Sequence, residues 1–276
     1  MHRFETPGPL ALRVAIGSGR VDVTAVDSAV TEVEVTPLRD DEGTRRAAAE
    51  TRVELLERGG RHELVVEAPE RLDLGSVLFR RGAKLGVTIR CPSGADLDVR
   101  TASAPVRATG VLGAVESKAA SGDVSFEDVR SLHAGAASGD VSARSVAEAC
   151  TVKTAAGDAH LGAVGGPLTV NLVSGDLELG EARDSVSVST VSGDQRLGAV
   201  SAGPVKLSSV SGDVRVGVRP GLRLYLDVGT VSGSARSDLD PDEAAAGEPG
   251  GEAVELRIRT VSGDARIERA AAPAPA

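Results

Sequence analysis

The chain has 276 residues, of which 41% are hydrophobic, and this is enough to build the core of one or two domains. Only 1% of the residues are aromatic and none is Trp, whereas Gly occurs 33 times, so the composition predicts a thin core of small aliphatic side chains. The formal net charge of -9 repels phosphate backbones and anionic lipid, which argues against binding of nucleic acid or of a membrane surface.

The first residues, MHRFETPGPLALRVAIG, lack the charged head, apolar run and cleavage site of a secretory signal. No stretch of the chain approaches the ~18 consecutive apolar residues of a membrane span. We therefore expect a cytoplasmic protein without direct membrane insertion, in which any association with the cell envelope occurs through a partner.

Residues 1–92 carry strand patterns of several kinds. Alternating apolar residues precede and follow Ser18-Gly19-Arg20 in LALRVAIGSGRVDVTAV. TRVELLERGGRHELVVEAP predicts a hairpin that turns at Gly59-Gly60, and KLGVTIRCP predicts another strand. We interpret residues 1–92 as a β-rich N-terminal cap that protects the first exposed sheet edge of residues 93–270.

From residue 93 the sequence is dominated by an internal repeat with the triplet Ser-Gly-Asp. Successive copies are 17 to 21 residues apart, and the last comes after 30. The copies begin at Ser121, Ser138, Ala156, Ser174, Ser192, Ser211, Ser232 and Ser262, and the copy at Ser232 ends in Ser234 instead of Asp. A degenerate copy stands at Ser103-Ala104-Pro105.

Apolar residues recur two apart around the triplets, as Leu168 and Val170 do before Ser174 and as Leu177 and Leu179 do after it. This is strand alternation with one face directed inward, and Gly supplies the tight corner between two strands. A single strand-corner-strand unit cannot bury its apolar face alone, but stacked units can. The sequence therefore predicts an all-β, single-chain β-solenoid of ~18-residue coils over residues 93–270.

Two segments interrupt or end this pattern. Residues 238–255 are rich in acidic residues and predict a solvated loop inserted between the last coils. Residues 271–276 are Ala and Pro only and predict a disordered tail.

Calcium binding is the sharpest chemical alternative for the triplet, because stacked coils would place its carboxylates in a row. The candidate residues are Asp123, Asp140, Asp158, Asp176, Asp194 and Asp213. Ca²⁺ takes six to eight oxygen ligands, and nonapeptide β-rolls supply them with several glycines per turn, whereas each coil here has one Gly and one Asp in its triplet. The competing interpretation is that Ser and Asp bind local backbone N–H groups at a corner, and it needs no cofactor.

Catalytic arrangements are not evident in the sequence. We find no G-x-S-x-G, S-x-x-K or Cys/His pattern, and Cys150 falls in an apolar column of the repeat. A carbohydrate-active enzyme with a groove site remains an alternative, although such enzymes hold sugars with aromatic rings and the coils offer only Phe126 and Tyr225. We therefore expect a non-enzyme with no catalytic residues.

The SGD ladder, together with LRVAIGSGRVDVTAVD and VTIRCPSGADLDVRTAS, resembles the bacterial putative-adhesin family of β-strand-repeat proteins, a domain of unknown function. The resemblance covers most of the chain and implies a β-strand-repeat fold and a role in adhesion or at the envelope. It supplies no catalytic residues. Taken together, the sequence predicts an adhesin-like binding or scaffolding protein that associates with an unknown protein partner or with itself. A calcium-stabilised adhesin and a carbohydrate-active enzyme are the alternatives.

Overall fold

The structure is a computed structural model, and it describes residues 1–69, 83–239 and 253–270. This part of the chain consists of β-strands with one short helix, which confirms the predicted all-β, solenoid-like class. It forms two compact units, Met1–Gly139 and Asp140–Ala276. The predicted division into a cap of residues 1–92, a solenoid of residues 93–270 and a tail of residues 271–276 stays a prediction.

The N-terminal unit is built around one long strand, β2, which pairs in parallel with strands on both of its sides. The elements of the unit are β1 (His2–Glu5), β2 (Leu10–Val26), β3 (Val30–Pro37), α1 (Glu42–Glu50), β4 (Arg52–Arg58), β5 (Arg61–Glu67), β6 (Lys84–Pro92), β7 (Asp96–Ser103), β8 (Val106–Ser121) and β9 (Val124–Ser138).

Strand β2 forms the first rung of the repeat, and the alternation around Ser18-Gly19-Arg20 predicts its two halves. Its first half pairs with β7 and its second half with β8, and its inward residues Leu12, Val14 and Val21 are buried. At the corner between the halves, the hydroxyls of Ser18 and Ser103 are 2.8 Å apart and hydrogen bonded. Residues far apart in sequence thus obey one stacking pattern.

The other side of β2 pairs with β5 and β6. Strands β5 and β6 pair with the two halves of β2, β4 forms an antiparallel hairpin with β5, and β3 lies antiparallel to both β1 and β6. The hairpin turns at Gly59 and Gly60, which have φ of 59° and 76°, as expected for a two-residue turn.

Helix α1 is absent from the sequence-based expectations. Asp41 caps it, since its Oδ1 accepts the backbone N–H of Thr44 at 2.8 Å. The short Ala-containing helix is solvated over most of its length, so it lacks the long apolar periodicity that identifies a helix from sequence.

The C-terminal unit consists of two parallel sheets connected by the corners. Sheet I contains β11 (Cys150–Ala156), β13 (Leu168–Ser174), β15 (Val186–Ser192), β17 (Pro204–Ser211), β21 (Ala253–Ser262) and β19 (Arg223–Ser232). Sheet II contains β10 (Val141–Val146), β12 (Ala159–Val164), β14 (Leu177–Ala182), β16 (Gln195–Val200), β18 (Val214–Val218), β22 (Ala265–Arg269) and β20 (Ala235–Ser237).

The register places like positions of the repeat side by side. In sheet I, Leu168 pairs with Val186, which pairs with Val205, and all three are buried. In sheet II, Leu179 pairs with the buried Leu197. The core is therefore a stack of thin apolar layers between the two sheets, and Cys150 occupies one of them, as its column predicts.

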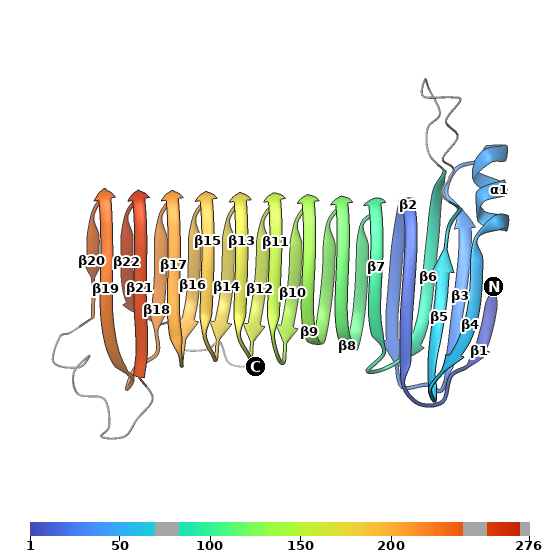
Figure 1. Ribbon diagram of the computed structural model, residues 1–276, viewed down its shortest axis with the longest axis horizontal. Helices are drawn as coiled ribbons and strands as arrows, with labels where there is room; N and C mark the ends of the chain where they lie inside the picture. The colour runs from blue at the N-terminus through green and yellow to red at the C-terminus, as the bar shows by residue number, and fades with distance from the viewer. Residues whose placement is uncertain (70–82, 240–252, 271–276) are drawn as a thin grey trace. The chain divides into compact units, whose positions relative to one another are not determined.

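The last coils of this unit do not stack in sequence order. Strand β21 pairs with β17 on one side and with β19 on the other, and β22 likewise lies between β18 and β20. Figure 1 shows the red β21 and β22 between the neighbouring coils. The coil of β19 and β20 is thus the terminal one, although a later part of the chain forms the coil beneath it.

Most of the predicted acidic loop, and the whole predicted tail, lie outside the described residues. Of the residues assigned to the loop, Ala253–Glu255 form the start of β21 and continue the register of the repeat.

Candidate functional site

The Ser-Gly-Asp corner combines a backbone constraint with a close approach between coils. The glycines of the eight triplet copies have φ between 129° and 146°, a region that residues with a side chain rarely adopt. A Cβ added at Gly193 would lie 2.0 Å from the carbonyl oxygen of Gly175 in the neighbouring coil. Glycine is therefore required both by the turn and by the stacking.

The Asp of the triplet binds the neighbouring coil. In the C-terminal unit, the backbone N–H of Asp158 donates to Oδ1 of Asp140 at 2.8 Å, and that of Asp176 donates to Oδ1 of Asp158 at 2.8 Å. The same bond joins Asp194 to Asp176, Asp213 to Asp194, and Asp264 to Asp213, at 2.8 to 2.9 Å. We call this series the Asp ladder.

The Asp ladder ends in the terminal coil. Oδ1 of Asp264 accepts the backbone N–H of Ser234 at 2.8 Å and its hydroxyl at 3.0 Å, and these bonds lower the pKa of Asp264. A carboxylate at position 234 would have no further corner to bind among the described residues. This explains why the triplet that ends in Ser234 instead of Asp occupies the end of the stack.

Five of the six predicted calcium candidates lie in this ladder, and the sixth, Asp123, lies in the N-terminal unit at the corner between β8 and β9. Asp194 also uses its second carboxylate oxygen, which is 3.0 Å from the Arg196 guanidinium. Across the described ranges, no group of three or more His, Cys, Asp or Glu side chains is placed to hold a metal ion. Calcium binding stays a prediction.

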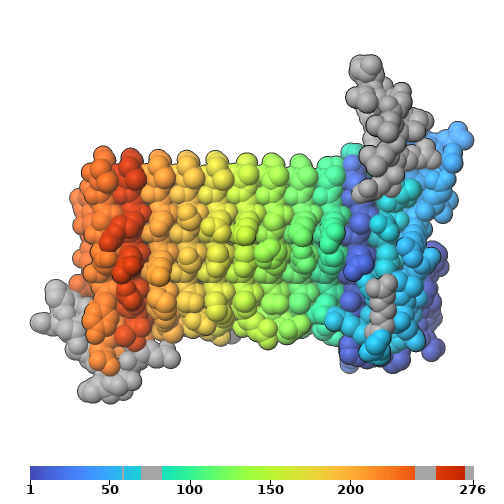
Figure 2. Space-filling model, viewed as in Figure 1, coloured from blue at the N-terminus to red at the C-terminus, as the bar shows by residue number. Residues whose placement is uncertain are grey.

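The outward face of sheet I carries an apolar row beside the corners. One valine precedes the triplet in each of five coils, and its side chain is 49% to 55% exposed in four of them and 82% exposed in the terminal coil. In spatial order these residues are Val173, Val191, Val210, Val261 and Val231, and we call them the valine ridge. Figure 2 shows this face of the C-terminal unit, with side chains of successive coils in straight rows.

The rows next to the valine ridge are polar. They are uncharged on β13 and β15, whereas the later coils carry Lys206, Arg257, Arg259 and Asp227 in the same rows. Asn171 pairs with Ser189, which pairs with Ser208, and in the following row Thr169 pairs with Ser187. All five side chains point outward and are exposed. Strands β13 and β15 thus present an outer surface of hydroxyl, amide and valine side chains.

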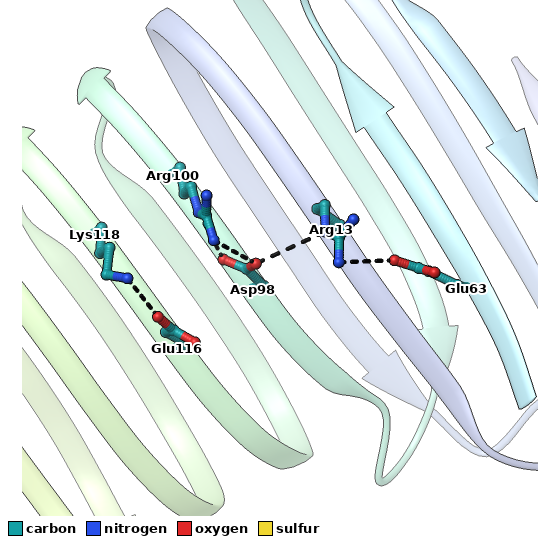
Figure 3. A network of polar contacts seen from close by, with 6 residues as sticks. All are labelled: Arg13, Glu63, Asp98, Arg100, Glu116 and Lys118. Atoms are coloured by element: carbon teal, nitrogen blue, oxygen red, sulfur yellow. Dashed lines mark hydrogen bonds and ion pairs between the residues drawn. The ribbon is translucent and has the colours of Figure 1, made fainter.

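The N-terminal unit has a different outer surface, which is lined with ion pairs (Figure 3). Arg13 on β2 lies between Glu63 on β5, at 2.9 Å, and Asp98 on β7, at 3.8 Å. Asp98 is also 3.1 Å from Arg100 on its own strand. Alternating charges in adjacent strands are typical of stabilising cross-strand pairs on a solvated sheet.

Strand β8 extends this charged surface. Lys118 is 2.6 Å from Glu116, and the hydrogen bond between them lowers the pKa of Glu116. Both side chains are about half exposed, so the pair contributes modestly to stability.

The two thiols are buried and unreactive by environment. Desolvation raises the pKa of Cys91 and of Cys150 to about 12, so both are protonated thiols at neutral pH. Neither thiol has the environment of an activated nucleophile.

The side chain of His160 lies 3.4 Å from Glu178 on the exposed face of sheet II.

Within the described part of the chain, no helix has the length and apolar character needed to cross a membrane.

The family model Toastrack DUF4097 matches residues 13–268, and the chain belongs to this family. The match confirms the resemblance to a β-strand-repeat domain of unknown function. Among curated proteins, none matches the sequence.

Three solved structures from bacteria are similar over most of their length. A putative cell adhesion protein from Clostridium sporogenes is 10% identical, with a TM-score of 0.24, and the match covers 96% of this chain and 93% of that one. A putative adhesin from Bacteroides fragilis is 13% identical, with a TM-score of 0.39 and coverage of 96% and 95%. A putative lipid binding protein from Parabacteroides distasonis is 12% identical, with a TM-score of 0.38 and the same coverage. These likenesses carry no conclusion about what this chain binds.

Proposed function

We propose that the protein is a non-enzymatic binding or scaffolding module that holds a protein partner on the outer face of sheet I. The observation that carries this proposal is the valine ridge, a row of exposed apolar side chains in adjacent coils. Exposed apolar rows with a polar rim are typical of surfaces that bind other proteins. The hydroxyl and amide rows beside the ridge provide that rim.

The repeat residues inside the coils support a structural role for the rest of the motif. Gly193 is required by the corner, Asp176 binds the next coil, and Val188 fills the core. The outward positions, such as Val191, have no such role in the described structure and are free to bind a partner.

Two further features favour a binding protein over an enzyme. Of the two rings that the coils offer, Phe126 is buried, which leaves Tyr225 alone to stack on a sugar. The buried, protonated thiols offer no nucleophile near neutral pH. The two free thiols also agree with a reducing compartment, and we place the protein in the cytoplasm, with envelope contact through its partner.

The proposal is tested with substitutions that change only the ridge. A double variant, Val191→Ser with Val210→Ser, removes apolar surface from the ridge. Val111→Ser is the matched control, because Val111 is 55% exposed but lies on β8 in the N-terminal unit. Each variant replaces the wild-type protein in the native cells, is crosslinked there and purified. Mass spectrometry then compares the recovered proteins.

We expect a partner that is recovered with wild type and with Val111→Ser, and whose recovery falls at least about tenfold with the double ridge variant. Equal recovery of every protein with all three forms would contradict a binding role for the ridge. Unchanged melting temperatures of the variants are required for the comparison, and exposed Val→Ser changes are expected to meet this condition.

A further inference from the structure

The terminal coil leaves part of the core open. Leu226 is 43% exposed, whereas Leu256, its register partner in the coil beneath, is 0% exposed. Leu224 and Val228 are likewise half-buried, although their partners Val254 and Ile258 are fully buried. The inward-facing row of β19 therefore has apolar surface that a further layer would cover.

One edge of β19 is not paired with another strand among the residues that the structure describes. The carbonyl of Ser232 accepts the backbone N–H of Gly263 at 3.0 Å, so the polar groups of Ser232 face β21. Because backbone groups alternate in direction along a strand, those of Tyr225, Asp227, Gly229 and Val231 face away from β21. Strand β19 has one hydrogen-bonded neighbour, β21, among the residues that the structure describes.

Strand β19 has few of the residues that usually prevent an edge strand from pairing with another chain. The strand has ten residues and contains neither Pro nor Lys, and its inward positions carry no charge. The carbonyl of Asp227 accepts a hydrogen bond from Nη1 of Arg259 at 2.9 Å, which leaves its second lone pair and its N–H available.

We propose that β19 pairs antiparallel with β19 of a second copy of this chain, around a two-fold axis through Val228. Antiparallel pairing about this residue joins Asp227 to Gly229 and Tyr225 to Val231 of the other copy, and every one of these residues has its polar groups on the free edge. Each such pair exchanges two backbone hydrogen bonds.

The side chains of β19 fit this register. On the outer face it brings together Tyr225 and Val231, which are 62% and 82% exposed in the single chain. On the inner face it brings Leu226 against Thr230 and places the two Val228 side chains together. An axis through Asp227 would instead place two carboxylates opposite each other, which destabilises a strand pair.

Ser234 favours this two-fold arrangement over a further parallel coil. Each parallel coil in the C-terminal unit places a corner N–H on an Asp carboxylate of its neighbour, and position 234 offers no carboxylate. A parallel coil from another protein would leave its corner N–H without that acceptor. Antiparallel pairing of β19 does not require a carboxylate at the corner.

The test uses the full chain and sedimentation velocity over a range of concentrations. We expect a dimer for wild type, and a dissociation constant at least about tenfold higher for Val231→Pro, because proline removes an edge N–H and its ring obstructs pairing. The N–H of Val231 faces away from β21, so the monomer loses no hydrogen bond. A monomeric wild type, or a Val231→Pro dimer of unchanged affinity, would overturn the proposal.

A second variant decides the question even if Val231→Pro does not fold. Two residues on the axis form a pair with Cα atoms about 4.5 Å apart, which suits a disulfide. Val228→Cys is therefore expected to give a covalent dimer under mild oxidation. Val191→Cys is the control, because it is exposed but distant in register from the axis. Equal crosslinking of the two variants, or none with Val228→Cys, would contradict the two-fold pairing.

Discussion

At the scale of single residues, the corner glycine meets two independent requirements that can be separated experimentally. Gly193 has φ of 140° and lies under the carbonyl of Gly175, whereas Gly221 has φ of 84° and open space around its Cα. The first position combines an unfavourable backbone with a clash, and the second has only the unfavourable backbone.

We therefore expect Gly193→Ala to lower the free energy of unfolding by more than about 2 kcal/mol, and Gly221→Ala by about 1 kcal/mol. Urea denaturation of both variants measures the difference. Equal losses would show that coil stacking at the triplet tolerates a side chain, against the geometry of the corner.

Asp176 binds the next coil through one oxygen atom. Oδ1 of Asp176 accepts the N–H of Asp194 at 2.8 Å, and an amide oxygen can take its place. We expect Asp176→Ala to lower the free energy of unfolding by about 1 to 2 kcal/mol, because it leaves a backbone N–H without its partner, and Asp176→Asn by clearly less.

Chemical denaturation of the two variants side by side tests this expectation. If Asn were as damaging as Ala, the negative charge and not the acceptor atom would be the important property of Asp176.

The buried thiols give a residue-scale prediction about reactivity. With their pKa raised to about 12 by desolvation, Cys91 and Cys150 have almost no thiolate at neutral pH. We expect a thiol reagent to label neither residue in the folded protein and both after unfolding. Rapid labelling of the folded chain at pH 7 would contradict their placement in the core.

At the scale of the coil, the sequence predicts most of what the structure contains. The alternation of residues such as Val186, Val188 and Leu197 identifies the strands, and the triplet identifies the corners, because both patterns arise from local backbone geometry. The hairpin at Gly59-Gly60 is predicted for the same reason.

The stacking order of the last coils is not predictable in this way. Every coil offers the same apolar columns to its neighbours, so β21 fits between β17 and β19 as well as it would fit beyond β19. The one local signal is Ser234, which replaces the Asp of the triplet. The role of Ser234 is evident only from the Asp ladder, because the coil that contains Ser234 is the last in the stack but precedes Asp264 in the sequence.

The candidate binding surface can also be predicted only in part from the sequence. The alternation rule assigns Val191 to the outward face, yet its importance depends on neighbours such as Val210 that lie in register only after folding. The free edge of β19 depends on the stacking order and could not be anticipated.

At the scale of the whole molecule, carboxyl groups with lowered pKa values make the free energy of unfolding depend on pH. Hydrogen bonds from Ser234 lower the pKa of Asp264, one from Arg259 lowers that of Asp227, and one from Arg183 lowers that of Glu181. A carboxyl whose pKa is lower in the folded state stabilises the protein above its unfolded value, and this contribution is lost as the pH falls through the folded value.

The free energy of unfolding is therefore expected to be steady from neutral pH to about pH 5 and to fall below about pH 4. Denaturation at a series of pH values measures this profile. Asp264→Asn keeps the acceptor but does not titrate, so it should reduce the acid-dependent loss. A variant profile identical to that of wild type would contradict a contribution from Asp264.

The carboxylate oxygens of the repeated triplet bind the next coil, and we predict that they do not bind a cation. The most direct test is thermal unfolding of the full chain in millimolar CaCl₂ and in excess EGTA. A ligand that binds only the folded state raises the melting temperature. We predict the same melting temperature under both conditions. A rise of several degrees in calcium, abolished by Asp176→Asn, would contradict the claim and identify the ladder as a calcium site.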